Sequence, residues 1–211
     1  MDATRAAGVM AALQALYPEA KPELNFRNPF ETLIATILSA QCTDKRVNMV
    51  TARLFPQYPD AFAMAKLTPQ ELEPMIRECG LYHNKAKNIV AASRALVEQY
   101  DGKVPSTRAE LMKLPGVGQK TAGVVLLAAF GDDQIPVDTH VFRVSRRIGL
   151  ADGNTPEKVE TQLREILEPA IWSHGHHLII WHGRRCCHAR KPECERCPLN
   201  GGLCEKHMEE K

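Results

Sequence analysis

The sequence contains no apolar run long enough to cross a membrane, and it carries little net charge of either sign. Its longest uninterrupted apolar run is 124–130, whereas a membrane-spanning helix needs about 20 consecutive apolar residues. The first residues also lack the apolar segment of a signal peptide. We therefore expect a soluble, intracellular protein of the cytoplasm with no membrane partner. The formal net charge of +2 does not by itself indicate a protein that binds nucleic acid.

Strict alternation of polar and apolar residues, the pattern of β-strands, is nearly absent. Apolar residues recur instead at helical spacing, as they do within 30–38, 72–79 and 86–100. Four residue pairs have the composition of helix starts, and the second and fourth also suggest a capping box: Asn28-Pro29, Thr68-Pro69, Pro105-Ser106 and Thr155-Pro156. These patterns predict an all-α fold of about nine or ten helices with short connections.

The number of cysteines, seven, is odd, which does not fit a framework in which every cysteine forms a disulfide. Cys42 and Cys79 lie within helical patterns, where cysteine is typical of a small buried apolar residue. Four others follow one another near the end of the chain, as Cys187-x6-Cys194-x2-Cys197-x6-Cys204. Four thiolates in a compact segment suit zinc or a [4Fe–4S] cluster, and the spacing alone leaves both open. Cys186 precedes Cys187 directly and is an alternative ligand.

The segment 114–131, LPGVGQKTAGVVLLAAFG, places a proline–glycine turn between two apolar stretches. It predicts a helix, a tight hairpin and a second helix. Glycine permits positive φ and close approach by another backbone. The amides of Gly116, Val117 and Gly118, with those that open the second helix, can therefore bind a DNA phosphate without reading sequence. A simple hairpin between two packed helices is the alternative interpretation of this turn.

Lys120 lies in the first turn of the second predicted helix, where the positive end of the helix dipole disfavours a cation. The same field favours the neutral amine, which is the form that attacks carbon. Asp138, in VDTH at 137–140, is a good N-cap for a following helix. Close to Lys120, its carboxylate would instead stabilise positive charge on a sugar or move a proton. A polar turn at 131–133 separates the two residues, so we expect a domain boundary with a cleft there.

Basic residues gather around Arg143 and around Lys191. Arg146 and Arg147 accompany the first, and Arg184, Arg185 and Arg190 flank the second. Either group can be solvated surface charge. Either can also contact DNA phosphates, and the second would do so from a loop that a bound metal holds rigid.

Several segments together resemble the endonuclease III family of helix-hairpin-helix DNA glycosylases. They are LPGVGQKTA with VDTH downstream, the terminal four-cysteine loop, LSAQCTDKRVN at 38–48, CGLYHNKAKNI at 79–89 and HHLIIWHGRRCCHARKPECERC at 176–197. The similarity extends over nearly the whole chain, and the combination is far more specific than any one segment.

The resemblance implies a fold of two domains. One is a six-helix domain over 22–132 that carries the hairpin, and the other is a helical domain built from 1–21 and 133–211. The resemblance also implies a [4Fe–4S] cluster in the loop 187–204, with Cys187, Cys194, Cys197 and Cys204 as its ligands. The last cysteine interval is one residue longer than the commonest family spacing, and Gly201-Gly202 is expected to absorb the additional residue as a bulge.

By the same resemblance, the protein is a bifunctional DNA glycosylase and AP lyase that excises oxidised pyrimidines. Lys120 attacks C1′ of the damaged nucleotide and forms a Schiff base, after which β-elimination nicks the strand 3′ to the abasic site. Asp138 matches the catalytic aspartate. Gln41 matches the residue that fills the space of the extruded nucleotide, and Leu81 matches a wedge on the opposite strand, although packing in the core is an alternative for Leu81. His140 matches a position near the interdomain junction, where it either contacts DNA or makes structural hydrogen bonds.

The implied partner is double-stranded DNA with damaged bases or abasic sites, bound by a monomer that associates with the nucleoid when on DNA. Two other functions compete with this one. An adenine-mismatch glycosylase of the same superfamily would carry a catalytic glutamate in the early helix, but 34–41 contains no carboxylate. A non-catalytic helix-hairpin-helix DNA-binding protein would not need Lys120 together with Asp138.

Overall fold

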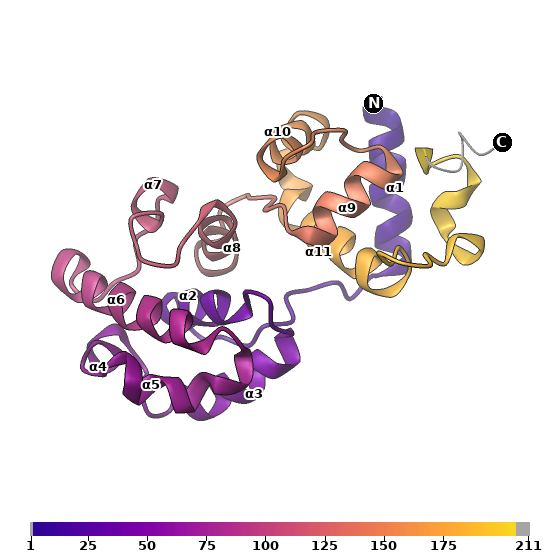
Figure 1. Cartoon of the computed structure of the whole chain (residues 1–211). Coiled ribbons are helices and arrows are strands. Elements are labelled where there is room, and N and C mark those ends of the chain that lie inside the picture. Colours follow the sequence, from indigo (N-terminus) through magenta and orange to yellow (C-terminus); the bar gives the residue numbers. More distant parts are fainter. Residues whose placement is uncertain (1, 206–211) are drawn as a thin grey trace. The chain divides into compact units, whose positions relative to one another are not determined.

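The computed structural model describes residues 2–205, which form eleven α-helices and three short 3-10 helices and contain no strand (Figure 1). The predicted all-α fold is confirmed. The helices outnumber the nine or ten expected, because α4 (Ala61–Ala65) and α7 (Arg108–Leu111) are too short to produce a periodic pattern. None of the helices among the described residues combines the length and hydropathy of a membrane-spanning helix.

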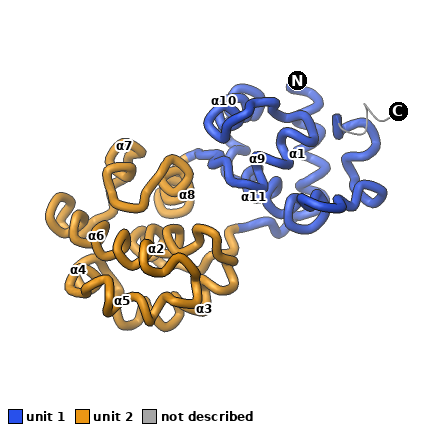
Figure 2. Tube along the Cα trace, in the orientation of Figure 1, with its two compact units in different colours: residues 1–21, 133–211 blue, residues 22–132 orange. Residues whose placement is uncertain are grey.

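The chain divides into two compact units (Figure 2). Unit 1 comprises Met1–Lys21 and Asp133–Lys211, and unit 2 comprises Pro22–Asp132. The division falls directly after α8 (Gln119–Phe130), which ends at Gly131 in the left-handed conformation. Each unit has its own hydrophobic core, so each buries apolar surface independently of the other.

Unit 2 contains α2–α8, and all of its residues are described. Its remaining elements are α2 (Pro29–Ser39), α3 (Asp44–Leu54), α5 (Pro69–Ile76), the 3-10 helix η1 (Arg77–Cys79) and α6 (Tyr82–Tyr100). The helix α2 is buried from Phe30 to Leu38 and contacts α3, α6 and α8, as expected for a helix at the centre of a core. The unit has seven α-helices where six were expected, since the first helix of the hairpin is the single-turn α7.

Unit 1 joins the beginning of the chain to its end. Its elements are α1 (Ala3–Leu16), α9 (Thr139–Ile148), α10 (Pro156–Ile166), α11 (Pro169–Arg185), η2 (Cys194–Arg196) and η3 (Pro198–Gly201). The helix α11 packs against α9 and α1, and α1 also contacts η3. Leu13, Val144, Ile179 and Leu199 are among the residues of the shared core. The N-terminal helix therefore supports the segment that holds the four cysteines.

Three of the four predicted helix starts are confirmed. Asn28, Thr68 and Thr155 are N-caps, and each is followed by proline at the first helical position. The capping box forms at Thr68 but was wrongly expected at Thr155, because the third helical residue there is Lys158, which offers no acceptor. The start expected at Pro105-Ser106 lies two residues further on, where Thr107 caps α7.

Candidate functional site

The predicted hairpin connects α7 to α8. Gly116 has a φ of +80°, and a Cβ atom added to it would lie 2.9 Å from the Cβ of Asn88 on α6. The turn therefore requires glycine at this position. The Val117 side chain is buried in the core of unit 2, and its amide donates to the Leu114 carbonyl at 3.1 Å. Val117 thus shapes the hairpin, and its side chain is not available to a ligand.

Gly118 is the N-cap of α8, and it has an ordinary extended backbone and no side chain to cap the helix. An added Cβ atom would meet nothing within 4 Å. The first amides of an α-helix have no intrahelical acceptor, and they lie at the positive end of the dipole. Gly116, Gly118 and Gln119 are exposed. The hairpin tip therefore presents donors suited to a phosphate oxygen.

Lys120 is the second residue of α8 and its side chain is exposed. Among the described residues, its ammonium has no ion-pair or hydrogen-bond partner. The amine is therefore held on a helix yet remains accessible to an external electrophile.

Asp138 is the N-cap of α9, so the predicted capping function is confirmed. Its Oδ1 accepts from the amides of His140 at 2.8 Å and Val141 at 2.7 Å. No described residue donates to Oδ2. Capping thus occupies one carboxylate oxygen and leaves the other for chemistry. Asp138 belongs to unit 1 and Lys120 to unit 2, and their proximity stays a prediction.

Gln41 and Leu81 are two of the four non-glycine residues with positive φ among those described, at 53° and 48°. Both side chains are exposed, and Leu81 is 54% exposed, so the core-packing interpretation of Leu81 is wrong. The left-handed conformation costs a non-glycine residue about 1–2 kcal/mol. Strain of this kind persists only where the surrounding structure enforces it, and it is concentrated at functional sites.

Cys42, next to Gln41, lies in the turn between α2 and α3 and is partly exposed. The expectation that Cys42 belongs to a helix is therefore wrong, because α2 ends at Ser39. Cys79 is buried in η1, as a small apolar residue would be.

Arg143 makes contacts that differ from those expected of a phosphate ligand. Its Nη2 donates to the carbonyls of Gly183 at 2.9 Å and Cys187 at 3.1 Å, and its Nε also points to Cys187 O, at 3.3 Å. Nη2 also lies 3.2 Å from His140 Nδ1, which must be the acceptor because a guanidinium has none. Arg143 thereby closes the C-terminal end of α11.

His140 faces Arg143 from the first turn of α9. Burial lowers the pKa of His140, with smaller contributions from Arg143 and Arg184, and the Asp138 carboxylate opposes the shift. His140 is therefore a neutral imidazole at neutral pH, held by the arginine that was predicted to contact DNA.

The four predicted ligand cysteines line one cavity of unit 1. Arg147, Ile148, His182, Cys186, Pro192 and Glu193 complete its lining. The guanidinium of Arg147 lies 3.8 Å from Cys187 Sγ, and the Arg147 carbonyl accepts from Cys204 Sγ at 3.6 Å. A neighbouring cation favours the thiolate that binds a metal. The donor set and the cavity therefore fit a thiolate-bound metal group.

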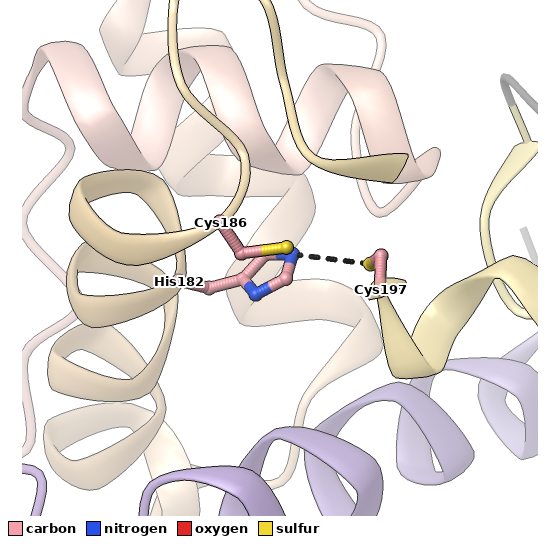
Figure 3. A group of neighbouring side chains, drawn as sticks. All are labelled: His182, Cys186 and Cys197. Carbon is pink, nitrogen blue, oxygen red and sulfur yellow. Dashed lines mark hydrogen bonds between the residues drawn. The ribbon is translucent and has the colours of Figure 1, made fainter. Parts of the chain in front are cut away.

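Three potential ligand atoms, from His182, Cys186 and Cys197, lie within 4.8 Å of one another (Figure 3). Only Cys197 of this trio belongs to the predicted quartet, and Cys186 was the alternative ligand to Cys187. Burial, followed by the effect of Cys197, raises the pKa of Cys186 to about 12, which favours its neutral thiol. Cys187, in contrast, lies beside the Arg147 guanidinium.

His182 connects the cavity to α1. Its Nε2 lies 3.7 Å from Cys197 Sγ (Figure 3), and its Nδ1 lies 3.2 Å from the hydroxyl of Tyr17. Burial lowers the pKa of His182 to about 4, and chiefly burial raises that of Tyr17 to about 12. Tyr17 therefore keeps its proton and donates to Nδ1, which leaves Nε2–H to donate to the sulfur.

The longer last cysteine interval is accommodated at Gly202. This glycine has a φ of +109°, and a Cβ there would meet nothing within 4 Å. The amides of Leu203 and Cys204 both donate to the Leu199 carbonyl, at 3.1 and 2.9 Å. The chain thus turns back and Cys204 reaches the cavity. Lys191, on the same loop, is exposed and has a φ of 51°.

Two features that contribute to the functional site were not identified from the sequence: Lys85 and the contact between Tyr17 and His182. Lys85 is buried on the apolar face of α6 that also includes Ile89 and Leu96. A lysine on an apolar stripe was the available signal. The contact of Tyr17 with His182 spans 165 residues of sequence, and no local pattern encodes it.

Comparison with known proteins places this site in a family. Residues 34–169 match the HhH-GPD superfamily of base excision DNA repair proteins, and residues 187–204 match the iron–sulfur binding domain of endonuclease III. Endonuclease III of Synechocystis sp. is 48% identical over 92% of this chain and 90% of its own length. Endonuclease III of Escherichia coli is 44% identical, over 97% of each chain.

A solved structure of a trapped endonuclease III–DNA covalent intermediate has a TM-score of 0.94 and 44% identity to this chain, and covers 100% of this chain and 99% of its own. The match over 187–204 also decides between the two metals that the spacing left open: the segment binds a [4Fe–4S] cluster, and zinc is the wrong alternative. The chain belongs to the endonuclease III family of the HhH-GPD superfamily of base excision DNA repair proteins.

Proposed function

We propose that this chain is a bifunctional DNA glycosylase and AP lyase that removes oxidised pyrimidines from duplex DNA. The observation that carries the proposal is the exposed, unpartnered amine of Lys120, one helical position beyond the hairpin that presents phosphate-binding amides. The covalent complex that a 44% identical endonuclease III forms with DNA supports nucleophilic catalysis by this family. A DNA substrate places the working enzyme on the nucleoid.

In the proposed reaction the neutral Lys120 amine attacks C1′, the bond from C1′ to the base breaks, and the base leaves with the bonding electrons and a proton. The bond from C1′ to O4′ then breaks, and the remaining proton of the amine nitrogen passes to O4′ as the sugar ring opens to the Schiff base. Abstraction of a C2′ proton then expels the 3′ phosphate by β-elimination, and water releases the lysine. Asp138 Oδ2, which no described residue occupies, is the group that stabilises charge or moves a proton in these steps.

DNA binding in this proposal uses three sets of contacts. Backbone amides of Gly116 and Gly118 bind phosphate at the hairpin tip, and Val117 shapes the tip through its buried side chain and its hydrogen bond to the Leu114 carbonyl. Gln41 and Leu81 enter the duplex, Gln41 at the extruded nucleotide and Leu81 beside the opposite strand. Lys191 contacts phosphate from the cysteine loop, and His140 and Arg143 also contact the DNA from α9.

We assign Cys187, Cys194, Cys197 and Cys204 as ligands of the [4Fe–4S] cluster. When bound, the group supplies a covalent crosslink that holds the loop, and Lys191 on it, in one conformation. His182 orients Cys197 through its Nε2–H, and the Arg147 guanidinium contacts Cys187 Sγ. Cys186 remains outside the ligand set.

Borohydride trapping tests the proposed function. Because the Schiff base is an imine, borohydride should reduce it and link the wild-type protein covalently to duplexes that contain thymine glycol or an abasic site. Lys120→Gln should form no covalent product and should retain binding to the damaged duplex. Stability should change by no more than about 0.5 kcal/mol, since the side chain is exposed.

A panel of duplexes that each carry one modified base separates the candidate substrates. Excision of adenine opposite 8-oxoguanine, with no action on thymine glycol, would favour the adenine-mismatch glycosylase. Binding to every duplex without trapping or nicking would favour the non-catalytic DNA-binding protein.

A further inference from the structure

Lys85 is a buried lysine near the start of α6. Its side chain is nearly inaccessible, at 5% exposure. Its Nζ donates to the carbonyl oxygens of Leu38 and Cys79, each at 2.8 Å. No carboxylate pairs with this ammonium among the described residues. The protein therefore places a cation inside unit 2 and stabilises it with backbone dipoles alone.

The two carbonyls belong to the ends of two different elements. Leu38 lies in the last turn of α2, and Cys79 is the last residue of η1. Carbonyls at the end of a helix lack an intrahelical donor and carry the negative end of the dipole. An ammonium between two such ends satisfies both and holds them at a fixed separation.

Each of these ends is followed by one of the strained, exposed residues. The chain leaves Leu38 and reaches Gln41 three residues later, and it leaves Cys79 and reaches Leu81 two residues later. The backbone amide of Lys85 also donates to the Leu81 carbonyl at 3.1 Å. Lys85 thus contacts the Leu81 segment through both its amide and its side chain.

The same two segments meet at a second point. Cys42, next to Gln41, lies near Cys79: burial first, and then this neighbouring thiol, raise the pKa of Cys79 to about 12. This thiol contact is neutral and weak, whereas the ammonium makes two charge-assisted bonds. Lys85 is therefore the stronger of the two connections between the segments.

We propose that Lys85 is a positioning residue that sets the separation and backbone conformation of Gln41 and Leu81, so that both enter damaged DNA together. The inference rests on the proposed DNA contacts of Gln41 and Leu81 and adds the group that couples them. Lys85 itself touches no DNA, because its side chain is buried. Its removal leaves two buried carbonyls without a donor and frees both segments to relax out of the left-handed conformation.

The test compares Lys85→Met with Lys85→Gln and with a control on the same helix face. Met keeps the length and the apolar stem but donates no hydrogen bond, whereas Gln keeps an N–H donor. Ile89→Val, one turn away and fully buried, weakens the core of unit 2 without removing either carbonyl's donor. Thermal unfolding and hydrogen exchange of 40–43 and 80–82 establish that each variant folds and where it loosens.

The functional readout is the fluorescence of 2-aminopurine placed opposite thymine glycol. This fluorescence rises when extrusion of the damaged nucleotide leaves 2-aminopurine unpaired and unstacked. Lys85→Met should lose most of the fluorescence rise and reduce the single-turnover base-excision rate by about tenfold or more. A tenfold decrease corresponds to an increase of about 1.4 kcal/mol in the activation free energy. Lys85→Gln should lie between Met and wild type, and Ile89→Val should match wild type in both measurements.

The outcomes separate this inference from the proposed function. A wild-type protein that cannot be trapped on damaged DNA refutes the proposed function and removes the basis for the inference. If wild type is trapped but Lys85→Met keeps the full fluorescence rise and excision rate, the positioning function is refuted alone. The positioning function is also refuted if Ile89→Val loses as much fluorescence rise and excision rate as Lys85→Met. Lower stability of unit 2 would then explain the loss in both variants. If Lys85→Met fails to fold, Lys85→Gln becomes the test. A fluorescence rise in Lys85→Gln equal to that of wild type would then refute the positioning function of Lys85.

Discussion

The helices of unit 2 and the cysteine loop of unit 1 reach a defined structure by different means. In unit 2, nearby side chains cap five helices, with N-caps at Asn28, Thr43, Asp60, Thr68 and Thr107. The loop after α11 contains only the short 3-10 helices η2 and η3 among its described residues. Its carbonyls are bound by side chains from α9: Arg143 donates to Cys187 and Arg147 to His188 and Ala189.

The stabilising contacts in the two regions differ in how far apart their residues lie in the sequence, and this determines whether the region needs a crosslink to hold its structure. The side-chain caps of unit 2 each span three positions, whereas the arginines of α9 reach carbonyls about forty positions away. A region built from local contacts forms with its helices. A loop built from distant contacts needs a crosslink, which the metal group supplies. The proposed nucleophile Lys120 lies in the first region, so the nucleophile and the cofactor are held by different units.

Loss of one metal ligand is the strongest way to test that separation. Cys194→Ser should reduce the iron content from about four per chain towards zero and unfold the loop of unit 1. The helices of unit 2 should persist, because their caps and core involve no residue of the loop. Iron analysis, the visible absorption of the cluster and hydrogen exchange of the two units measure these effects.

Cys186→Ser is the matched control for ligand loss, since Cys186 lines the same cavity. It should leave the iron content unchanged. An equal loss of iron in both variants would show that the proximity of Cys186 to His182 and Cys197 reflects coordination, and the assignment of Cys187 would then be wrong.

Asp138 tests whether a residue of unit 1 takes part in the chemistry of unit 2. Asp138→Asn keeps a good N-cap, so the free energy of unfolding should be nearly unchanged. Base excision should fall by about 10²–10⁴-fold, the usual contribution of a positioned acid or base. Single-turnover kinetics on thymine glycol duplexes measure the rate.

Asp138→Ala supplies the comparison, because it removes the cap as well and should lower stability by about 0.5–2 kcal/mol. Wild-type excision by Asp138→Asn would mean that Asp138 is a cap only.

A substitution in the hairpin of unit 2 should have the smallest effect of those considered, and it acts on DNA affinity. Gly118→Val should weaken binding to an abasic-site analogue by about tenfold, corresponding to about 1.4 kcal/mol, because the side chain crowds the exposed amides. The fold should be retained, since an added Cβ meets nothing within 4 Å. Affinity measured over a range of salt concentrations should also show the decline that phosphate contacts produce.

Gly116→Ala separates binding from folding at the same turn. Its positive φ and the close approach of Asn88 predict a loss of stability that Gly118→Val does not share. Unchanged affinity in folded Gly118→Val would contradict phosphate binding by the hairpin.

Local chemistry made much of this protein readable without a structure. Pro and Ser/Thr/Asn/Asp caps marked helix starts to within two residues, Gly116 marked the hairpin, and Asp138 was recognised as an N-cap. Spacing identified four cysteines that do line one cavity. These features depend on residues a few positions apart, so periodicity and residue type suffice to predict them.

Contacts between distant segments were decided only by the tertiary structure. Arg143 binds the end of α11, Leu81 is exposed at a left-handed turn, and Lys85 joins the ends of α2 and η1. Cys186, not Cys187, approaches His182 and Cys197. A side chain's partner depends on which carbonyls and cavities packing brings within about 3 Å of it, and no periodic pattern in the sequence records that distance.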